Sequence, residues 1–153
     1  MTSGEGSFVD ANVLVYAALK EDVRHAACRS LLRNPSGHLL YLSPQILAEF
    51  YSTITSPKRV NTPLTAAAAI EFIETLLGHH HIVLLPISAD VPARWLSLLK
   101  RSDVRGPLVF DFQIAATMLA HGVTKLITYN GADFKSVSEI EILEPPSANP
   151  SAD

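Results

Sequence analysis

The sequence has little cysteine, no long apolar run and no recognisable export signal. Cys28 is the only cysteine, so an internal disulfide is excluded and the chain suits a reducing compartment such as the cytoplasm. No apolar run approaches the roughly 20 residues that a membrane-spanning helix needs. Residues 1–6 lack the basic start and the apolar stretch of a secretory signal. We therefore expect a cytoplasmic protein that is not attached to a membrane.

Basic residues are also scarce. The 12 lysines and arginines are outnumbered by 15 aspartates and glutamates, which gives a net charge of −3 with neutral histidines. This balance is a poor match to a protein that holds duplex DNA through a broad basic face. It leaves open an enzyme that acts on nucleic acid, because clustered carboxylates lower the net charge and a bound metal ion would reverse the sign locally.

Apolar residues are plentiful instead. They make up 48% of the 153 residues, which is enough for one sizeable core and therefore for one domain. We expect this domain to span residues 7–144. A flexible N-terminus (1–6) should precede it, and a disordered tail (145–153), rich in proline and small residues, should follow it.

Strand-like and helix-like apolar segments alternate along the chain. This alternation predicts an α/β fold with a mainly parallel central sheet and helices on both faces. The predicted strands are one that ends at Asp10 and three that cover 38–42, 81–87 and 125–128. The predicted helices are 13–19, 23–32 (capped by Asp22), a segment after the capping Ser43, 66–77 (capped by Thr65), a segment around Trp95 (capped by Asp90) and 110–121.

Four carboxylates occur where an unpaired charge is costly. Asp10 ends the buried first strand, with apolar residues on both sides of it. Glu49 lies in an otherwise apolar helix, Asp111 in the first turn of an apolar helix, and Asp133 just after the last predicted strand. Each of these three has an ordinary explanation on its own, as a solvated residue, a partner of the helix dipole or a turn cap. Asp10 is the hardest to explain in this way.

Considered together, the four carboxylates indicate a shared site. The strand ends of a parallel sheet lie along one edge, so side chains from separate βα units are expected to converge there. Carboxylates held close together repel one another unless a cation joins them, and a site made only of oxygen ligands favours Mg²⁺ or Mn²⁺ over Zn²⁺. Such a cation lowers the pKa of bound water and stabilises the charge of a phosphoryl displacement. The predicted chemistry is phosphodiester hydrolysis assisted by Mg²⁺, with Mn²⁺ able to substitute.

Four segments of the chain resemble, in order, the motifs of PIN-domain nucleases. They are 10–17 around Asp10, 47–50 around Glu49, 109–116 around Asp111, and 126–134, which holds Thr128, Asn130 and Asp133. The resemblance extends from about Phe8 to Pro145, which is nearly the whole chain. Within this family the chain is most similar to the VapC-type toxins of bacterial and archaeal toxin–antitoxin pairs, to which residues 55–65 are also similar.

The resemblance implies a single PIN-like domain that acts as a Mg²⁺-dependent endoribonuclease, the toxin of a type II toxin–antitoxin pair. It also implies RNA as the substrate, a homodimer, and inhibition by a cognate VapB-type antitoxin. By position, Asp10 and Asp111 would be the main metal ligands, and Glu49 and Asp133 would complete the acidic site. Thr128 could hydrogen-bond to a ligand carboxylate or to the attacking water.

One side of this site departs from the family pattern. Many relatives carry aspartate where this chain has Asn130, and an asparagine offers a carbonyl oxygen without a charge. Either Asp133 supplies the missing charge, or the site holds a second metal ion weakly. Asn12 follows Asp10 by two residues and could orient that carboxylate.

Candidate contacts to RNA phosphates are Lys58, Arg59 and Arg105, although each could simply lie on a solvated surface. Two other functions remain open. A non-catalytic RNA-binding or scaffold module on the same fold would fit the uncharged Asn130. A metal-dependent phosphomonoesterase is the weaker alternative, because the second aspartate that such enzymes carry after the first is here Asn12, and no lysine follows a third strand at the expected place.

Overall fold

The computed structural model describes residues 6–33 and 35–147, so most of the expected flexible N-terminus and tail (1–5 and 148–153) lies outside the described residues. Five strands form one sheet in this part of the chain: β1 (Gly6–Val9), β2 (Leu39–Leu42), β3 (Ile82–Leu84), β4 (Lys125–Ile127) and β5 (Glu141–Leu143). The connecting helices are α1 (Ala11–Ala18), α2 (His25–Arg33), α3 (Pro44–Ile54), α4 (Ala66–Leu77), α5 (Val91–Arg101), α6 (Leu108–Ala120) and the short 3₁₀ helix η1 (Gly131–Phe134).

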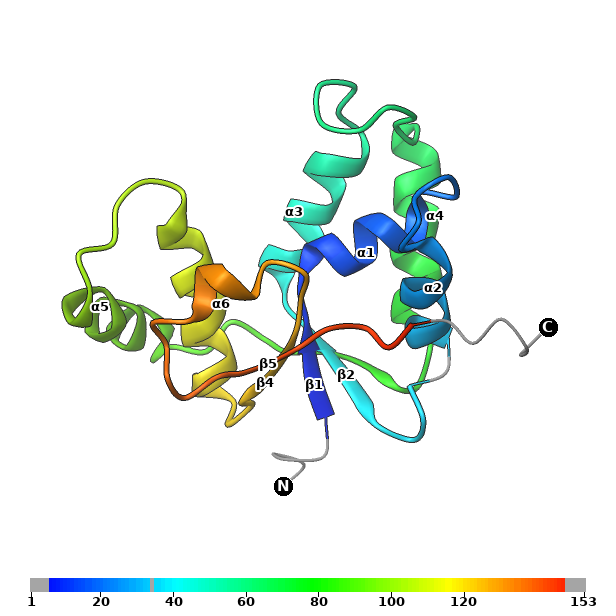
Figure 1. Cartoon of the computed structure of the whole chain (residues 1–153). Helices are drawn as coiled ribbons and strands as arrows, with labels where there is room; N and C mark the ends of the chain where they lie inside the picture. Colours follow the sequence, from blue (N-terminus) through cyan, green and yellow to red (C-terminus); the bar gives the residue numbers. More distant parts are fainter. Residues whose placement is uncertain (1–5, 34, 148–153) are drawn as a thin grey trace.

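The first strand lies in the middle of the sheet. The strand order is β3-β2-β1-β4-β5, and all neighbouring strands are parallel. The chain therefore builds outward from β1 to one side through β2 and β3, and later to the other side through β4 and β5 (Figure 1). The carboxyl end of β1 is the point where the strand order reverses, and such a point forms a crevice in open α/β sheets.

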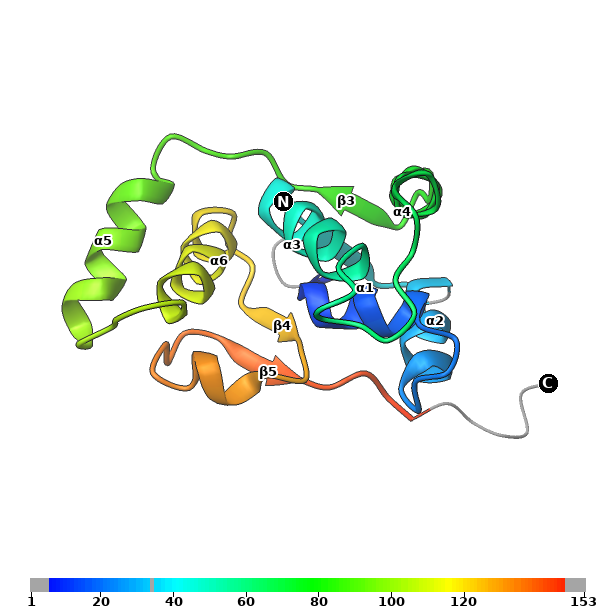
Figure 2. The ribbon, with the colours of Figure 1, turned by 90° about the horizontal axis from the view of Figure 1, so that it is seen from above.

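Helices cover both faces of this sheet. Figure 2 shows α5 and α6 on one side, and α1, α2 and α4 on the other. The predicted α/β class with a mainly parallel sheet and two helical layers is confirmed. Among the helices of the described residues, none has the length and apolar character needed to cross a membrane.

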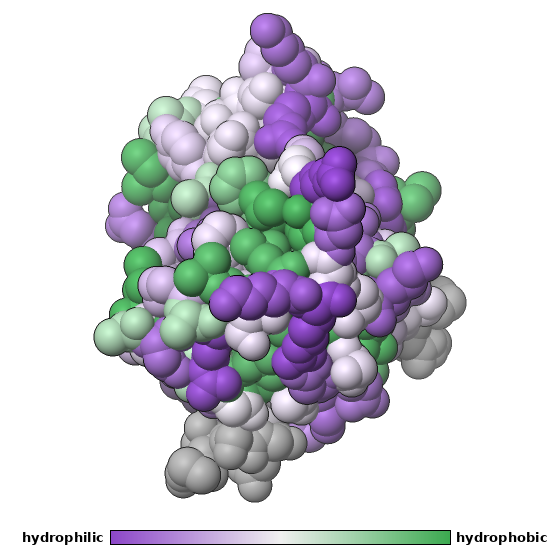
Figure 3. Space-filling view, turned by 90° about the vertical axis from the view of Figure 1, so that its left-hand side faces the viewer, coloured by the Kyte–Doolittle hydropathy of each residue, from purple (hydrophilic) through white to green (hydrophobic). Residues whose placement is uncertain are grey.

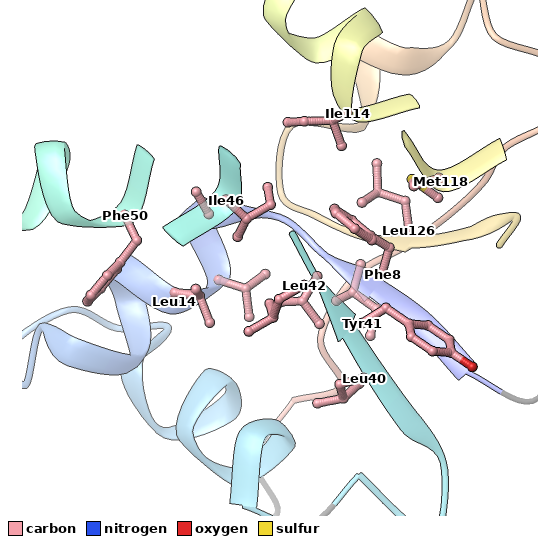
Figure 4. Close-up of a cluster of buried hydrophobic side chains, with 14 of the residues drawn as sticks. Phe8, Leu14, Leu40, Tyr41, Leu42, Ile46, Phe50, Ile114, Met118 and Leu126 are labelled. Carbon is pink, nitrogen blue, oxygen red and sulfur yellow. The ribbon is translucent and has the colours of Figure 1, made fainter. Parts of the chain in front are cut away.

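The core fills the space between the sheet and its helices. Strands of a parallel sheet are buried on both faces, so most residues of β1, β2 and β4 are apolar and buried. Figure 4 shows how side chains from β1, β4 and α6 meet on one side, and side chains from β2, α1 and α3 on the other. The labelled members are Phe8, Leu126, Ile114 and Met118 in the first group, and Leu42, Leu14, Ile46 and Phe50 in the second.

The predicted helix caps are only partly correct. Helix α4 has the predicted bounds, and the Thr65 hydroxyl accepts a hydrogen bond from the Ala68 N–H at 3.1 Å. The prediction for Asp22 is wrong, because α2 begins at His25 and the Asp22 carboxylate instead accepts hydrogen bonds from Arg24. Asp90 does lie directly before α5, but its carboxylate makes no capping bond and accepts a hydrogen bond from Arg94 instead. The Ser43 hydroxyl precedes α3 but makes no capping bond and, within the described residues, no other hydrogen bond.

Both ends of the domain differ from their predicted bounds. The first strand begins at Gly6, which belonged to the predicted flexible segment, and Pro145 of the predicted tail is buried. The edge strand β5 was not predicted. It has three residues and an acidic start, so it carries no periodic pattern, and it is defined by its pairing with β4. The third strand is also shorter than predicted, because it ends at Leu84.

The close approach of β1 and β2 at Gly6 gives a stability prediction. An alanine Cβ at this position would lie 2.7 Å from the Leu39 carbonyl oxygen and 2.6 Å from Cε2 of Tyr41. Because the backbone itself must shift, we expect Gly6→Ala to lower the free energy of unfolding by about 1–3 kcal/mol. Chemical denaturation would measure the change. Ser7→Ala, on the same strand but without added volume, should stay within about 0.5 kcal/mol; equal effects of both changes would contradict the packing explanation.

Candidate active site

The site begins at the carboxyl end of β1. The backbone N–H of Asp10 still pairs with the Ile127 carbonyl of β4 at 3.0 Å, and α1 starts at the next residue. The Asp10 side chain is only 5% exposed, so its charge lies at the buried centre of the sheet edge. A carboxylate in this place needs fixed hydrogen-bond donors to remain ionised.

Three donors hold the Asp10 carboxylate. The Ala11 N–H donates to Oδ1 at 2.8 Å, and the Thr128 hydroxyl donates to Oδ2 at 2.8 Å. The Asn12 amide also donates to Oδ2, at 3.3 Å. These bonds lower the pKa of Asp10, but burial outweighs them and the pKa is raised overall. The site therefore holds Asp10 in one orientation while leaving its negative charge incompletely compensated.

The residues that follow β4 complete this hydrogen-bond network. Thr128 is fully buried, and its hydroxyl oxygen accepts hydrogen bonds from the Asn12 amide and from the Asn130 N–H, both at 3.0 Å. The Asn12 side-chain oxygen accepts from the Tyr129 N–H at 3.2 Å. Asn12 thus links the first turn of α1 to the residues after β4, and its position relative to Asp10 is fixed from both sides.

A cleft of about 1060 Å³ opens above this network. All four predicted carboxylates line it, namely Asp10 after β1, Glu49 of α3, Asp111 of α6 and Asp133 of η1. They come from widely separated parts of the chain, as the convergence of strand ends at one sheet edge requires. The uncharged Asn130 lines the same cleft.

Gln45 connects two walls of the cleft. Its amide nitrogen donates to Glu49 Oε1 and to the Phe110 carbonyl oxygen, both at 3.0 Å. This bridge joins α3 to the first turn of α6, directly before Asp111. The ring of Phe110 itself is 57% exposed and lines the cleft, whereas the following Phe112 is buried in the core.

Burial and neighbouring negative charges raise the pKa values of Asp111 and Glu49. Burial raises the pKa of Asp111 to about 7, with further contributions from the charges of Asp10, Asp133 and Glu49. Burial also raises the pKa of Glu49, as does the charge of Asp10, while Gln45 and Arg59 act in the opposite direction. The raised pKa of Asp111 thus reflects its burial first and the neighbouring negative charges second, and both would be offset by a bound cation.

This charge and donor chemistry fit a divalent cation. The cleft offers carboxylate oxygens and an asparagine, which are ligands of hard ions such as Mg²⁺ and Mn²⁺ rather than of Zn²⁺. As the side chains stand, no three His, Cys, Asp or Glu residues of the described chain are gathered closely enough to hold an ion. Mg²⁺ usually keeps several of its waters and is bound through one or two carboxylates, so this spacing is compatible with a hydrated ion.

Only one of the three predicted RNA contacts lies at the cleft. Arg59 lines it, close enough to Glu49 to influence its pKa. Lys58 is exposed but is not part of the lining, and Arg105 lies elsewhere on the surface in an ion pair with Asp103 at 2.9 Å. The position of Arg105 gives no support to its predicted role.

Sequence reasoning missed a second arginine in the lining. Arg24 lies on the loop between α1 and α2 and faces the cleft with Tyr16 and Asp22. The sequence signal was present as Asp-Val-Arg at 22–24, since an aspartate two residues before an arginine can close a turn around it. That aspartate was read as a helix cap instead.

Comparison with known proteins agrees with this geometry. The sequence model of the PIN domain matches residues 7–140, which is most of the chain. The chain belongs to the PIN domain family. The predicted family is therefore confirmed, and the four predicted carboxylates of the cleft lie within the matched part of this PIN domain. Ribonucleases of the family generally depend on a divalent metal ion.

Individual relatives are VapC proteins. Ribonuclease VapC24 of Mycobacterium tuberculosis (strain CDC 1551) is 25% identical to this PIN domain over 138 residues, which cover 90% of this chain and 94% of the relative. Two solved structures share the fold at 18% identity and a TM-score of 0.65. One is M. tuberculosis VapC20, a sarcin–ricin loop cleaving toxin (86% of this chain, 95% of that chain). The other is VapBC2 of Rickettsia felis bound to a promoter DNA fragment (90% and 97%).

The raised pKa of Asp111 predicts how stability depends on pH. Between its ordinary pKa of 3.8 and about 7, the folded protein keeps a proton on Asp111 that the unfolded chain has lost. The folded state then binds more protons, so the free energy of unfolding falls as the pH rises through this range. In EDTA, we expect the melting temperature of the unaltered protein to fall between about pH 4 and 7 relative to that of Asp111→Asn.

Thermal denaturation at several pH values would measure this difference. The exposed Asp103→Asn is the matched control, and its profile should follow that of the unaltered protein. Parallel profiles for the unaltered protein and Asp111→Asn would show that Asp111 titrates normally.

Proposed function

We propose that this protein is a VapC-type toxin, a Mg²⁺-dependent endoribonuclease that hydrolyses phosphodiester bonds of RNA. The observation that carries the proposal is the gathering of Asp10, Glu49, Asp111 and Asp133 at the switch point of a PIN-domain sheet, with the pKa of Asp111 raised to about 7. So much uncompensated charge in one cleft is costly for folding, and a site that binds a cation explains why it is present.

The positions of the cleft residues suggest a separate role for each of them. Asp10 and Asp111 would hold the Mg²⁺ ion, with Glu49 and Asp133 completing the acidic site directly or through water. When bound, the ion supplies an acidified water and a positive charge opposite the phosphoryl group. Thr128 and Asn12 keep the Asp10 carboxylate in its orientation, because both donate to Oδ2.

RNA as the substrate is supported by the relatives. The curated relative is named a ribonuclease, and VapC20 is described as cleaving the sarcin–ricin loop. Of the three predicted RNA contacts, Arg59 is the one that lines the cleft, so it is the one that we retain as a substrate contact.

We also infer a VapB-type antitoxin as the inhibitor and a homodimer as the assembly. Solved structures of the same fold include VapBC complexes from Rickettsia felis and Haemophilus influenzae. Leu84, Ile87 and Leu96 are 43%, 75% and 50% exposed along the edge strand β3 and helix α5. Figure 3 shows apolar side chains gathered between charged ones on the face that carries α5, as is typical of contact surfaces.

Loss of a metal-binding carboxylate should abolish cleavage. We expect Asp10→Asn and Asp111→Asn each to slow the cleavage of single-stranded RNA by at least about 100-fold, because even the neighbours of metal ligands are typically worth 10–100-fold. EDTA should stop the unaltered protein, and added Mg²⁺ should restore it. Gel assays on a labelled RNA would measure the rates.

Glu74→Gln, an exposed carboxylate change on α4, is the control and should leave the rate unchanged. Full activity of either aspartate variant would contradict the proposal. RNA binding without any cleavage, together with no response to Mg²⁺, would instead indicate the non-catalytic RNA-binding module.

Asp133 is expected to replace the charge that Asn130 lacks. Both residues line the cleft, and the charge of Asp133 acts on Asp10 and Asp111. We expect Asp133→Asn to lower the cleavage rate by about 10-fold, and the further change Asn130→Asp to restore most of it. The rates of both variants at saturating Mg²⁺ would decide this, and no rescue by the second change would show that the two positions are not equivalent.

A further inference from the structure

The side chain of Arg24 is fixed at the wall of the catalytic cleft. Its Nε and Nη2 atoms donate to the two carboxylate oxygens of Asp22, each at 2.9 Å, and its backbone N–H donates to the same carboxylate at 2.9 Å. Its guanidinium carbon lies 3.5 Å from the centre of the Tyr16 ring. An aromatic face and a bidentate carboxylate together leave the guanidinium little freedom.

The tyrosine beneath Arg24 is itself supported from the core. The Tyr16 and Tyr129 rings meet edge to face with their centres 5.4 Å apart. The Tyr129 hydroxyl lies 3.5 Å from the sulfur of Cys28, which is fully buried. Tyr129 follows Thr128 directly, so the support of Arg24 is continuous with the network that holds Asp10.

This arrangement differs from the other arginine–carboxylate pairs of the described chain. Arg94–Asp90, Arg101–Glu139 and Arg105–Asp103 are also close pairs, at 2.7–2.9 Å, but none of their residues lines the cleft. Exposed pairs of this kind contribute little to stability. Among the arginines of these four pairs, Arg24 is the one that both stacks on an aromatic ring and lines the acidic cleft.

Part of the Arg24 guanidinium remains available. Asp22 uses Nε and Nη2, and within the described residues no acceptor is bound to Nη1. The cleft wall carries five carboxylates, including Asp22, against the two arginines Arg24 and Arg59. A polyanion that enters this cleft is repelled by five of the seven charged side chains of its lining, so a cation fixed in the wall would favour binding in addition to the proposed metal ion. A guanidinium with free N–H groups is well suited to a phosphate.

We propose that Arg24 binds a backbone phosphate of the RNA strand next to the bond that is cleaved, and that Asp22 and Tyr16 act as positioning residues for its guanidinium. The inference rests on the proposed ribonuclease function and names a substrate contact for it. A phosphate contact fixes the register of a strand without reading its sequence. Arg24 should therefore act on all RNA substrates alike.

The salt dependence of RNA binding tests this contact. In an Asp10→Asn background, which prevents cleavage, the dissociation constant of a short single-stranded RNA is measured between about 50 and 200 mM salt. Each phosphate contact to a single strand adds about 0.7 to the slope of log affinity against log salt. We expect Arg24→Ala and Arg24→Gln to lower this slope by about 0.7. Arg94→Ala, which breaks another arginine–aspartate pair away from the cleft, should leave it unchanged.

Steady-state cleavage gives a second measurement. With Asp10 intact, Arg24→Ala should raise KM by about 10-fold with little change in kcat, because the lost contact is a binding contact. Arg24→Lys should have a KM between those of the unaltered protein and Arg24→Ala, since an ammonium keeps the positive charge but loses the two parallel N–H donors of the guanidinium. Tyr16→Leu should shift KM in the same direction as Arg24→Ala but less.

The outcomes separate this inference from the proposed function. An unchanged slope in the Arg24 variants, or an equal change in Arg94→Ala, would overturn the phosphate contact while leaving the ribonuclease intact. A loss of kcat with KM unchanged would overturn it as well. If the unaltered protein neither cleaves nor binds RNA, the proposed function fails and this inference fails with it. Melting temperatures of each variant exclude loss of folding as the cause.

Discussion

The hydrogen bond between the Thr128 hydroxyl and the Asp10 carboxylate is the contact on which the rest of the site depends. It joins residues 118 positions apart at a distance of 2.8 Å, inside a sheet edge where both side chains are buried. A buried carboxylate without such a donor would be protonated or would be excluded from the core. The Asn12 amide and the Asn130 N–H donate hydrogen bonds to the same hydroxyl oxygen, so Thr128 holds together the residues at the base of the cleft.

The cleft has the features of a site that gives up stability for function. Burial and neighbouring negative charges raise the pKa values of Glu49 and Asp111, so both carboxyl groups oppose the folded state near neutral pH. Proteins tolerate such local cost where binding compensates for it. The surrounding parallel sheet, with its fully buried side chains from β1, β2, β4, α3 and α6, provides the stability that this arrangement requires.

The sequence was most informative where several independent patterns agreed. The α/β class followed from alternating strands and helices, and the four carboxylates could be placed at one sheet edge because parallel strand ends share it. The details that depend on single side chains were less predictable. Asp22 and Asp90 have the residue type of a cap, yet a nearby arginine competes for each carboxylate. Strand β5 is defined by its pairing with β4, which no local pattern records. The Asp-Val-Arg sequence at 22–24 indicates a turn, but it does not show that Arg24 lies over Tyr16 at the cleft.

The central position of β1 also has a consequence for the order of synthesis. Asp10 is synthesised 118 residues before Thr128, which follows directly after β4. Until then β1 has a neighbour on one side alone, and the Asp10 carboxylate lacks the hydroxyl that fixes it. The half of the sheet that can form first contains no completed site. A chain that stops before Thr128 lacks the donor that fixes Asp10, so the base of the cleft cannot form before β4 and Thr128 have been synthesised.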